Sequence, residues 1–156
     1  MLKYCAILFH NLRRCYWRLF KPVTLGASAL IFDQTGSVLL VRNTYRVGWH
    51  LPGGGVHKGE HFISAAIREV QQETSISCKE ADLQLFGLYS NFSEGNFDYV
   101  VVYTATGAFD LLNFKPALEI AECKFFKVNA LPGNLGAGSA RRIAEWQGER
   151  SKSLEW

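Results

Sequence analysis

The spacing of hydrophobic and polar positions changes several times along the chain, and each change predicts an element. Residues 24–32 and 37–42 are apolar runs joined by a short polar segment, 33–36, that ends in glycine. Two such runs with a link of this kind predict a β-hairpin. Further strands are predicted by runs rich in β-branched and aromatic residues, at 83–89, 97–106 and 122–128.

Helical spacing occurs in two places in the body of the chain. From His61 to Ser75 the apolar positions recur every three or four residues, which predicts one apolar helix face, made by Phe62, Ile63, Ala66, Ile67 and Val70. A closing helix is predicted over 137–147. The segment 48–57 is so rich in glycine that we expect no regular structure there. Strands and helices mixed in one short chain predict an α/β or α+β fold with a mixed sheet.

The beginning of the chain has a pattern of its own. Residues 2–20 place large apolar side chains among basic ones, with no proline before Pro22, which predicts an amphipathic helix. Such a helix can lie on an anionic membrane surface, or it can pack on the domain or on a second subunit of a homodimer. We favour packing over membrane association, because short helices usually gain their stability from packing.

These patterns divide the chain into an N-terminal helix at 1–21, one folded domain at 22–150 and a short tail at 151–156. The 156 residues are 48% hydrophobic and 20% charged, which excludes a disordered or low-complexity protein. No apolar run approaches the roughly 20 residues that cross a bilayer, so we expect no integral membrane protein.

Charge and cysteine content narrow the class further. The net charge is +3, but the first 21 residues hold five basic residues and no acidic one, so the remaining chain is slightly negative. The predicted domain therefore lacks the basic face of a nucleic-acid-binding protein, and we expect no such partner. The four cysteines are widely spaced with no C-x-x-C pair, which favours reduced thiols and a cytoplasmic location.

Candidate chemistry lies in residues 51–76, where a glycine-rich turn leads into the predicted helix. Residues three and four apart share a helix face, so we expect Glu69, Gln72 and Glu73 to project together, opposite the apolar face. Two carboxylates one turn apart offer the oxygen ligands that Mg²⁺ and Mn²⁺ prefer. Glycine lets the backbone approach a metal or phosphate that a Cβ would obstruct.

This segment resembles the Nudix box, G-x5-E-x7-R-E-U-x-E-E-x-G-U, in which U is a bulky aliphatic residue. Seven of its nine fixed positions are matched, by Gly54, Glu60, Arg68, Glu69, Val70, Glu73 and Ile76. The two departures are Gln72, in place of the first of the paired acids, and Ser75, in place of the glycine. The preceding Trp49-x-Leu-Pro-Gly-Gly run also resembles the usual lead-in of the family.

The resemblance implies an α/β/α sandwich that uses Mg²⁺ or Mn²⁺ to hydrolyse a pyrophosphate bond. The implied substrate is a small nucleotide-type molecule, a nucleoside diphosphate linked to another moiety, X. By position, the implied catalytic residues are Arg68, Glu69 and Glu73. Of these, Glu69 and Glu73 would hold the metal together with the Gly53 carbonyl, and Arg68 would hold Glu69 in place.

The departures modify this expectation. Gln72 removes one negative charge, so we expect weaker metal binding with activity retained. Ser75 falls where the helix should end in a left-handed residue, which costs a non-glycine residue about 1–2 kcal/mol. The alternative function is a Nudix-fold nucleotide-binding or regulatory module with weakened or lost catalysis. Because Arg68, Glu69 and Glu73 are all retained, we favour the enzyme.

Several other charged residues are candidates for contacts at the same site. Arg42 and Arg46 flank the glycine turn, and with Gly54 and Glu119 they are our candidate substrate-binding residues. Glu119 or Glu122 is a candidate replacement for the charge missing at Gln72, and the alternative is exposure to solvent. For Glu60, a metal ligand and a salt bridge to Arg68 are equally open.

The remaining candidates are assigned to the core or to the surface. Trp49, Tyr89, Phe92 and Phe97 would stack on a base or pack in the core, and we favour the core. Arg141 and Arg142, on the predicted closing helix, are interpreted as surface charge.

Overall fold

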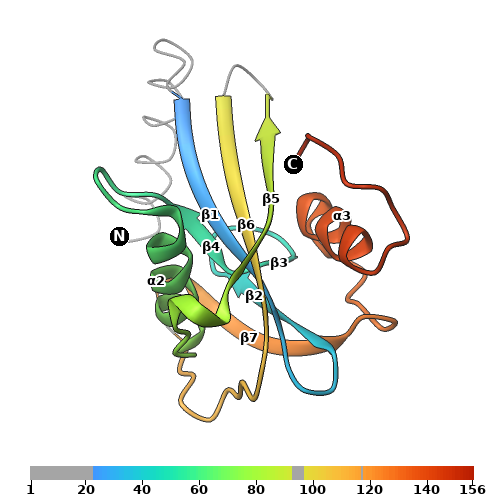
Figure 1. Ribbon diagram of the computed structural model, residues 1–156. Coiled ribbons are helices and arrows are strands. Elements are labelled where there is room, and N and C mark those ends of the chain that lie inside the picture. Colours follow the sequence, from blue (N-terminus) through green and yellow to red (C-terminus); the bar gives the residue numbers. More distant parts are fainter. Residues whose placement is uncertain (1–22, 93–96, 117) are drawn as a thin grey trace.

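A computed structural model describes residues 23–92, 97–116 and 118–156 (Figure 1). The elements in chain order are β1 (Val23–Phe32), β2 (Ser37–Asn43), β3 (Trp49–His50), β4 (Gly53–Gly55), α2 (Phe62–Thr74), the 3-10 turn η1 (Glu80–Asp82), β5 (Gln84–Asn91), β6 (Phe97–Thr106), β7 (Ile120–Lys127) and α3 (Ala137–Trp146). The helix expected at 1–21 lies outside the described residues. No helix within the described residues is both long and apolar enough to span a membrane.

The described strands form one mixed sheet in the order β3-β2-β1-β6-β5, with β4 paired to β1 and β7 paired to β2. Strands β1 and β6 run parallel over their whole length, from Val23 opposite Phe97 to Phe32 opposite Thr106. The other pairs are antiparallel. Helix α2 covers one face of the sheet and α3 the other (Figure 1). The expected α/β/α sandwich with a mixed sheet is confirmed.

Strand β1 supplies side chains to both layers of the core. Ala27, Ala29 and Ile31 pack on the α2 face, whereas Leu30 and Phe32 pack on the α3 face. Successive residues of a strand point to opposite faces, so a strand with both faces covered reads as one continuous apolar run. This explains why β1 ends in a continuous apolar run, from Ala29 to Phe32, with no alternation of apolar and polar residues.

The predicted hairpin forms, but its strands separate at once. Asp33 closes the turn by accepting hydrogen bonds from the backbone amides of Thr35 and Ser37, both at 2.9 Å. Strands β1 and β2 then pair at Phe32 and Val38. The earlier part of β1 pairs instead with β4. The expectation that residues 48–57 lack regular structure is therefore wrong, because the missing side chains of the glycines let this segment pair as a strand.

Two element boundaries bear on the site. Helix α2 ends at Ser75, which has φ 63° and ψ 9°, so the left-handed residue expected there is confirmed. Its amide donates to the Gln71 carbonyl at 2.9 Å, which satisfies one of the last helical carbonyls. Strand β7 begins at Ile120, two residues earlier than predicted, and directly follows Glu119.

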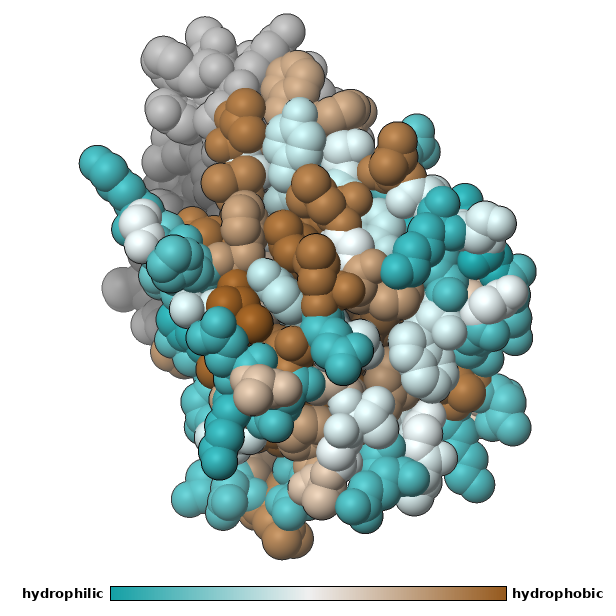
Figure 2. Space-filling model, viewed as in Figure 1, coloured by the Kyte–Doolittle hydropathy of each residue, from teal (hydrophilic) through white to brown (hydrophobic). Residues whose placement is uncertain are grey.

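The four aromatic candidates do not all lie in the core. Trp49 and Tyr89 are buried, as predicted, but Phe92 is 61% exposed and Phe97 is 38% exposed, so the core assignment is wrong for these two. Their rings lie 5.8 Å apart, where β5 ends and β6 begins. Figure 2 shows apolar side chains gathered over this region.

The interpretation of Arg142 as surface charge is wrong, because its side chain is fully buried. Its guanidinium lies 3.7 Å from the centre of the Tyr89 ring, pairs with Glu145 at 2.8 Å and donates to the Glu155 carbonyl at 2.9 Å. These partners come from β5, from the next turn of α3 and from the tail. A dipeptide of two arginines on a helix does not show that a later segment folds back over one of them.

Replacement of Arg142 by alanine should destabilise the protein strongly. It would leave the Glu145 carboxylate buried without a cation, which typically costs about 3–5 kcal/mol. Chemical denaturation of wild type and variant measures this loss. The double variant R142M/E145M removes both charges and should recover most of the stability. A double variant as unstable as R142A would show that the unpaired carboxylate is not the cause.

Candidate active site

The glycine strand β4 lies directly against the carboxylates of α2. The Gly53 amide donates to Glu73 Oε2 at 2.9 Å. A Cβ placed on Gly54 would lie 2.5 Å from Glu69 Oε1, so the Glu69 carboxylate occupies the space that any other residue would fill. At the neighbouring position, a Cβ on Gly53 would lie 2.6 Å from the Ala27 carbonyl oxygen of β1. Glycine at position 53 therefore lets β4 come this close to β1, and glycine at position 54 leaves the space in which the Glu69 carboxylate lies.

Arg68 connects the glycine strand, the helix and the loop before it. Its Nη1 donates to Glu69 Oε1 at 2.5 Å, so the structure contains the hydrogen bond expected between these residues. Nη1 also lies 3.2 Å from Gln72 Oε1, and Nη2 donates to the Gly55 carbonyl at 2.9 Å. The side-chain amide of Gln72 thus faces Arg68.

Glu60 is the strongest partner of Arg68. The guanidinium donates to both carboxylate oxygens, through Nε at 2.8 Å and Nη2 at 2.9 Å, and the His57 amide donates to Glu60 Oε2 at 2.9 Å. These hydrogen bonds lower the pKa of Glu60 to about 2. Of the two roles left open for Glu60, the structure places it in the salt bridge. The two hydrogen bonds to Glu60 fix the orientation of the Arg68 guanidinium, and the guanidinium in turn holds the Glu69 carboxylate in place.

Glu73 does not lie opposite the apolar face, so that part of the expected arrangement is wrong. Two turns of helix separate it from Ala66, which is fully buried, and residues seven apart lie on the same side of a helix. Burial, together with the hydrogen bond from the Gly53 amide, which lowers the pKa, and the negative charges of Glu69 and Glu119, which raise it, gives Glu73 a pKa of about 7, above its ordinary value. Glu119 therefore lies close enough to Glu73 to act on it electrostatically.

The donor atoms at this place suit a hard divalent cation. Among the described residues, no three His, Cys, Asp or Glu side chains form a metal-binding group. Glu69 and Glu73 nevertheless offer two carboxylates beside a partly exposed glycine backbone, and their mutual repulsion is a cost that a bound cation relieves. Mg²⁺ commonly takes one or two carboxylates and fills the rest of its shell with water and substrate oxygens. The residues present fit such an ion.

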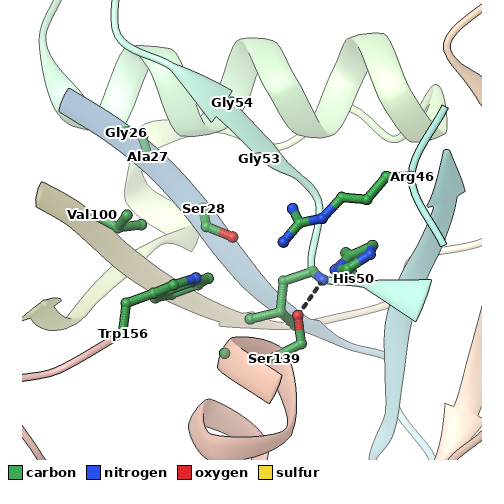
Figure 3. Close-up of a pocket in the computed structure, with 12 residues that line it drawn as sticks. Gly26, Ala27, Ser28, Arg46, His50, Gly53, Gly54, Val100, Ser139 and Trp156 are labelled. Atoms are coloured by element: carbon green, nitrogen blue, oxygen red, sulfur yellow. Dashed lines mark hydrogen bonds between the residues drawn. The ribbon is translucent and has the colours of Figure 1, made fainter. Parts of the chain in front are cut away.

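The two candidate arginines occupy different surroundings. Arg42 forms an ion pair with Glu122 across the β2–β7 ladder, so each of these two residues already has a partner of opposite charge. Arg46 forms no ion pair with a carboxylate of the described residues. Its guanidinium points into a cavity of about 180 Å³ on the α3 face of the sheet, toward Ser28 (Figure 3).

The cavity contains residues that the sequence did not identify. It is lined by β1, β4, β6 and the start of α3, with Trp156 on the side away from Arg46 (Figure 3). Ser139 accepts a hydrogen bond from the Leu51 amide at 3.0 Å, and the Ser28 hydroxyl donates to the Pro52 carbonyl at 2.8 Å. The tryptophan in a short, mostly polar tail was the one available signal, and no local pattern linked it to the glycine turn.

Comparisons of this chain with known proteins point to one family. A model of the NUDIX domain matches residues 22–147. The RNA pyrophosphohydrolase of Pelagibacter ubique (strain HTCC1062) is 32% identical over 71 residues, 44% of this chain and 45% of that protein. Diphosphoinositol polyphosphate phosphohydrolase 2 of Mus musculus is 36% identical over 83 residues, 51% of this chain and 45% of that protein. The chain thus spans less than half the length of these curated relatives.

A solved structure shows the same fold over a larger part of the chain. The MutT protein from Methanosarcina mazei Go1 superposes with a TM-score of 0.70 at 23% identity, and the match covers 85% of this chain and 99% of that one.

Replacement of Gly54 by alanine should weaken metal binding with little loss of stability. The new Cβ meets only the end of the flexible Glu69 side chain, so the carboxylate moves while the backbone stays. We expect the affinity for Mn²⁺, measured by calorimetry, to fall by about 10–100-fold. Gly55→Ala is the matched control, because nothing lies within 4 Å of its Cβ position. Equal Mn²⁺ affinity in the two variants would contradict this arrangement.

The raised pKa of Glu73 predicts a pH-dependent stability in metal-free protein. Because this pKa is about 7 in the folded state and ordinarily 4.5, the folded protein retains a proton that the unfolded chain loses. The stabilisation is complete below about pH 4.5 and is lost as the pH rises through 7, a loss of about 3 kcal/mol. Denaturation with chelator present, from pH 4 to 8, should show this decline in wild type and a flatter profile in Glu73→Gln. Parallel profiles would exclude Glu73 as its source.

Proposed function

The chain belongs to the Nudix family, and from this premise we propose that it is a metal-dependent pyrophosphohydrolase. The proposed reaction cleaves the pyrophosphate bond of a small nucleotide-type substrate, a nucleoside diphosphate linked to another moiety. The observation that carries the proposal is the contact of the Glu69 and Glu73 carboxylates with the glycine strand β4. This arrangement sets two anionic oxygen donors beside a backbone that a phosphate can approach.

The proposed metal ligands are Glu69 and Glu73, with the Gly53 carbonyl as a third. Bound there, Mg²⁺ or Mn²⁺ would offset the phosphate charge and lower the pKa of a coordinated water. Arg68 orients Glu69 by holding Oε1, which leaves Oε2 to accept a hydrogen bond from the attacking water. Glu119, whose charge acts on Glu73, is the proposed additional acidic group.

Arg46 is the proposed phosphate-binding residue, whereas Arg42 is not. The guanidinium of Arg46 points into the cavity that Gly53 and Gly54 also line, so it can donate to a phosphate lying along β4. Gly54 contributes to substrate binding by the absence of a side chain. The relatives are named for RNA and for diphosphoinositol polyphosphates, so membership of the family does not select the substrate.

A panel of nucleoside diphosphate derivatives with Mg²⁺ or Mn²⁺ tests the proposal. Wild type should release phosphate-containing products from at least one member, and Glu69→Gln and Glu73→Gln should each lower kcat/KM by about 100-fold or more. Arg46→Ala should raise KM about tenfold through the loss of a charged hydrogen bond, and Arg42→Ala, the matched control, should leave it unchanged. Nucleotide binding without turnover of any member would instead support the alternative, a binding or regulatory module for which Gln72 is the first indication.

A further inference from the structure

The cavity beside β4 has one wall that comes from outside the domain predicted from the sequence. Trp156 projects into it from the side opposite Arg46 (Figure 3). The indole rests against the first turn of α3, where a Cβ on Gly138 would lie 2.5 Å from the indole Nε1. The glycine at position 138 therefore provides the space in which the indole lies.

Trp156 is held firmly in this position. Its amide donates to the Ser90 carbonyl at 2.8 Å, and the Ser90 amide donates to the Leu154 carbonyl at 2.8 Å, so the tail runs along the edge strand β5. Arg141 donates to the Trp156 carbonyl, and the buried Arg142 donates to the Glu155 carbonyl. Four backbone attachments fix the direction in which the indole points, unlike a loosely attached chain end.

The rest of the cavity suits a flat heterocycle. Gly26 has no side chain, and Val100 provides an apolar surface beside it. The Ser139 oxygen accepts from the Leu51 amide, which leaves its hydroxyl hydrogen to donate. The Ser28 hydroxyl donates to Pro52, which leaves its lone pairs to accept. An aromatic wall with one donor and one acceptor at its rim matches the face and the edge of a nucleobase.

The size and the position of the cavity agree with the binding of a nucleobase. The cavity of about 180 Å³ is smaller than the roughly 300–1,000 Å³ of pockets that enclose a whole ligand, so it takes one part of a substrate. Gly53 and Gly54 line it on one side, and the same two glycines contact Glu73 and Glu69 on the other. A base in the cavity would place its phosphates along β4, between Arg46 and the carboxylates.

We propose that Trp156 is a specificity-determining residue that stacks on the base of the nucleotide substrate, in a pocket completed by the tail and held by Arg142. This inference rests on the proposed function for the direction in which the phosphates lie, but the pocket itself binds without chemistry. It can therefore be tested in metal-free protein, separately from hydrolysis.

The experiment compares binding of nucleoside 5′-monophosphates with binding of ribose 5-phosphate by calorimetry on the full chain. Stacking predicts that at least one monophosphate binds about tenfold or more tightly than ribose 5-phosphate. Trp156→Ala should abolish this preference, and Trp156→Phe, which restores a flat ring, should recover most of it. Leu154→Ala is the matched control from the same tail, because its side chain is exposed and does not line the cavity.

A preference that persists in Trp156→Ala, or its absence in wild type, overturns the inference. A preference lost equally in Trp156→Ala and Trp156→Phe also overturns it, because a flat ring would then not be what is recognised. Hydrolysis of the diphosphate panel without any base preference would refute this inference alone. A base preference without hydrolysis would refute the proposed function alone.

Discussion

The close approach of three elements, β1, β4 and α2, at Gly53 and Gly54 is the constraint on which the rest of the site depends. Strand β4 fits between β1 and the carboxylate-bearing side of α2 because neither glycine has a side chain to hold these elements apart. The same contact turns the Gly53 amide toward Glu73 and leaves room for Glu69. A side chain at Gly53 would meet the backbone of β1, and a side chain at Gly54 would displace the Glu69 carboxylate, so in either case the two carboxylates would no longer meet a common backbone.

Electrostatics make this arrangement costly without a cation. Glu73 is partly buried near two other acids, and Arg68, the one arginine that contacts Glu69 among the described residues, divides its hydrogen bonds between Glu60 and Glu69. Gln72 lowers this cost, because an amide replaces what would be a further carboxylate beside Arg68. We therefore expect this departure from the Nudix box to weaken metal binding while it leaves the Glu69–Glu73 pair intact.

Local patterns predicted the elements well because their causes are local. The period of β6 and of α2, and the left-handed end at Ser75, follow from residues next to one another in the chain. The pairing of Gly53–Gly55 as a strand was missed because it depends on contact with β1. Arg142 is buried because Tyr89 and the tail cover it. Arg42 is paired because Glu122 lies opposite it on the neighbouring strand. None of these long-range contacts leaves a periodic signal.

In the proposed function, chemistry and substrate selection would lie on opposite sides of strand β4. The carboxylates belong to the box and lie on the α2 side of β4, whereas Arg46 and Trp156 lie outside the box, beside the cavity on the α3 side. Relatives that share the box are named for quite different substrates. Because Arg46 comes from a loop and Trp156 from the tail, these two residues can change without moving Glu69 or Glu73. Glycine at β4 is the one feature that both sides require, so it limits what such variation can alter.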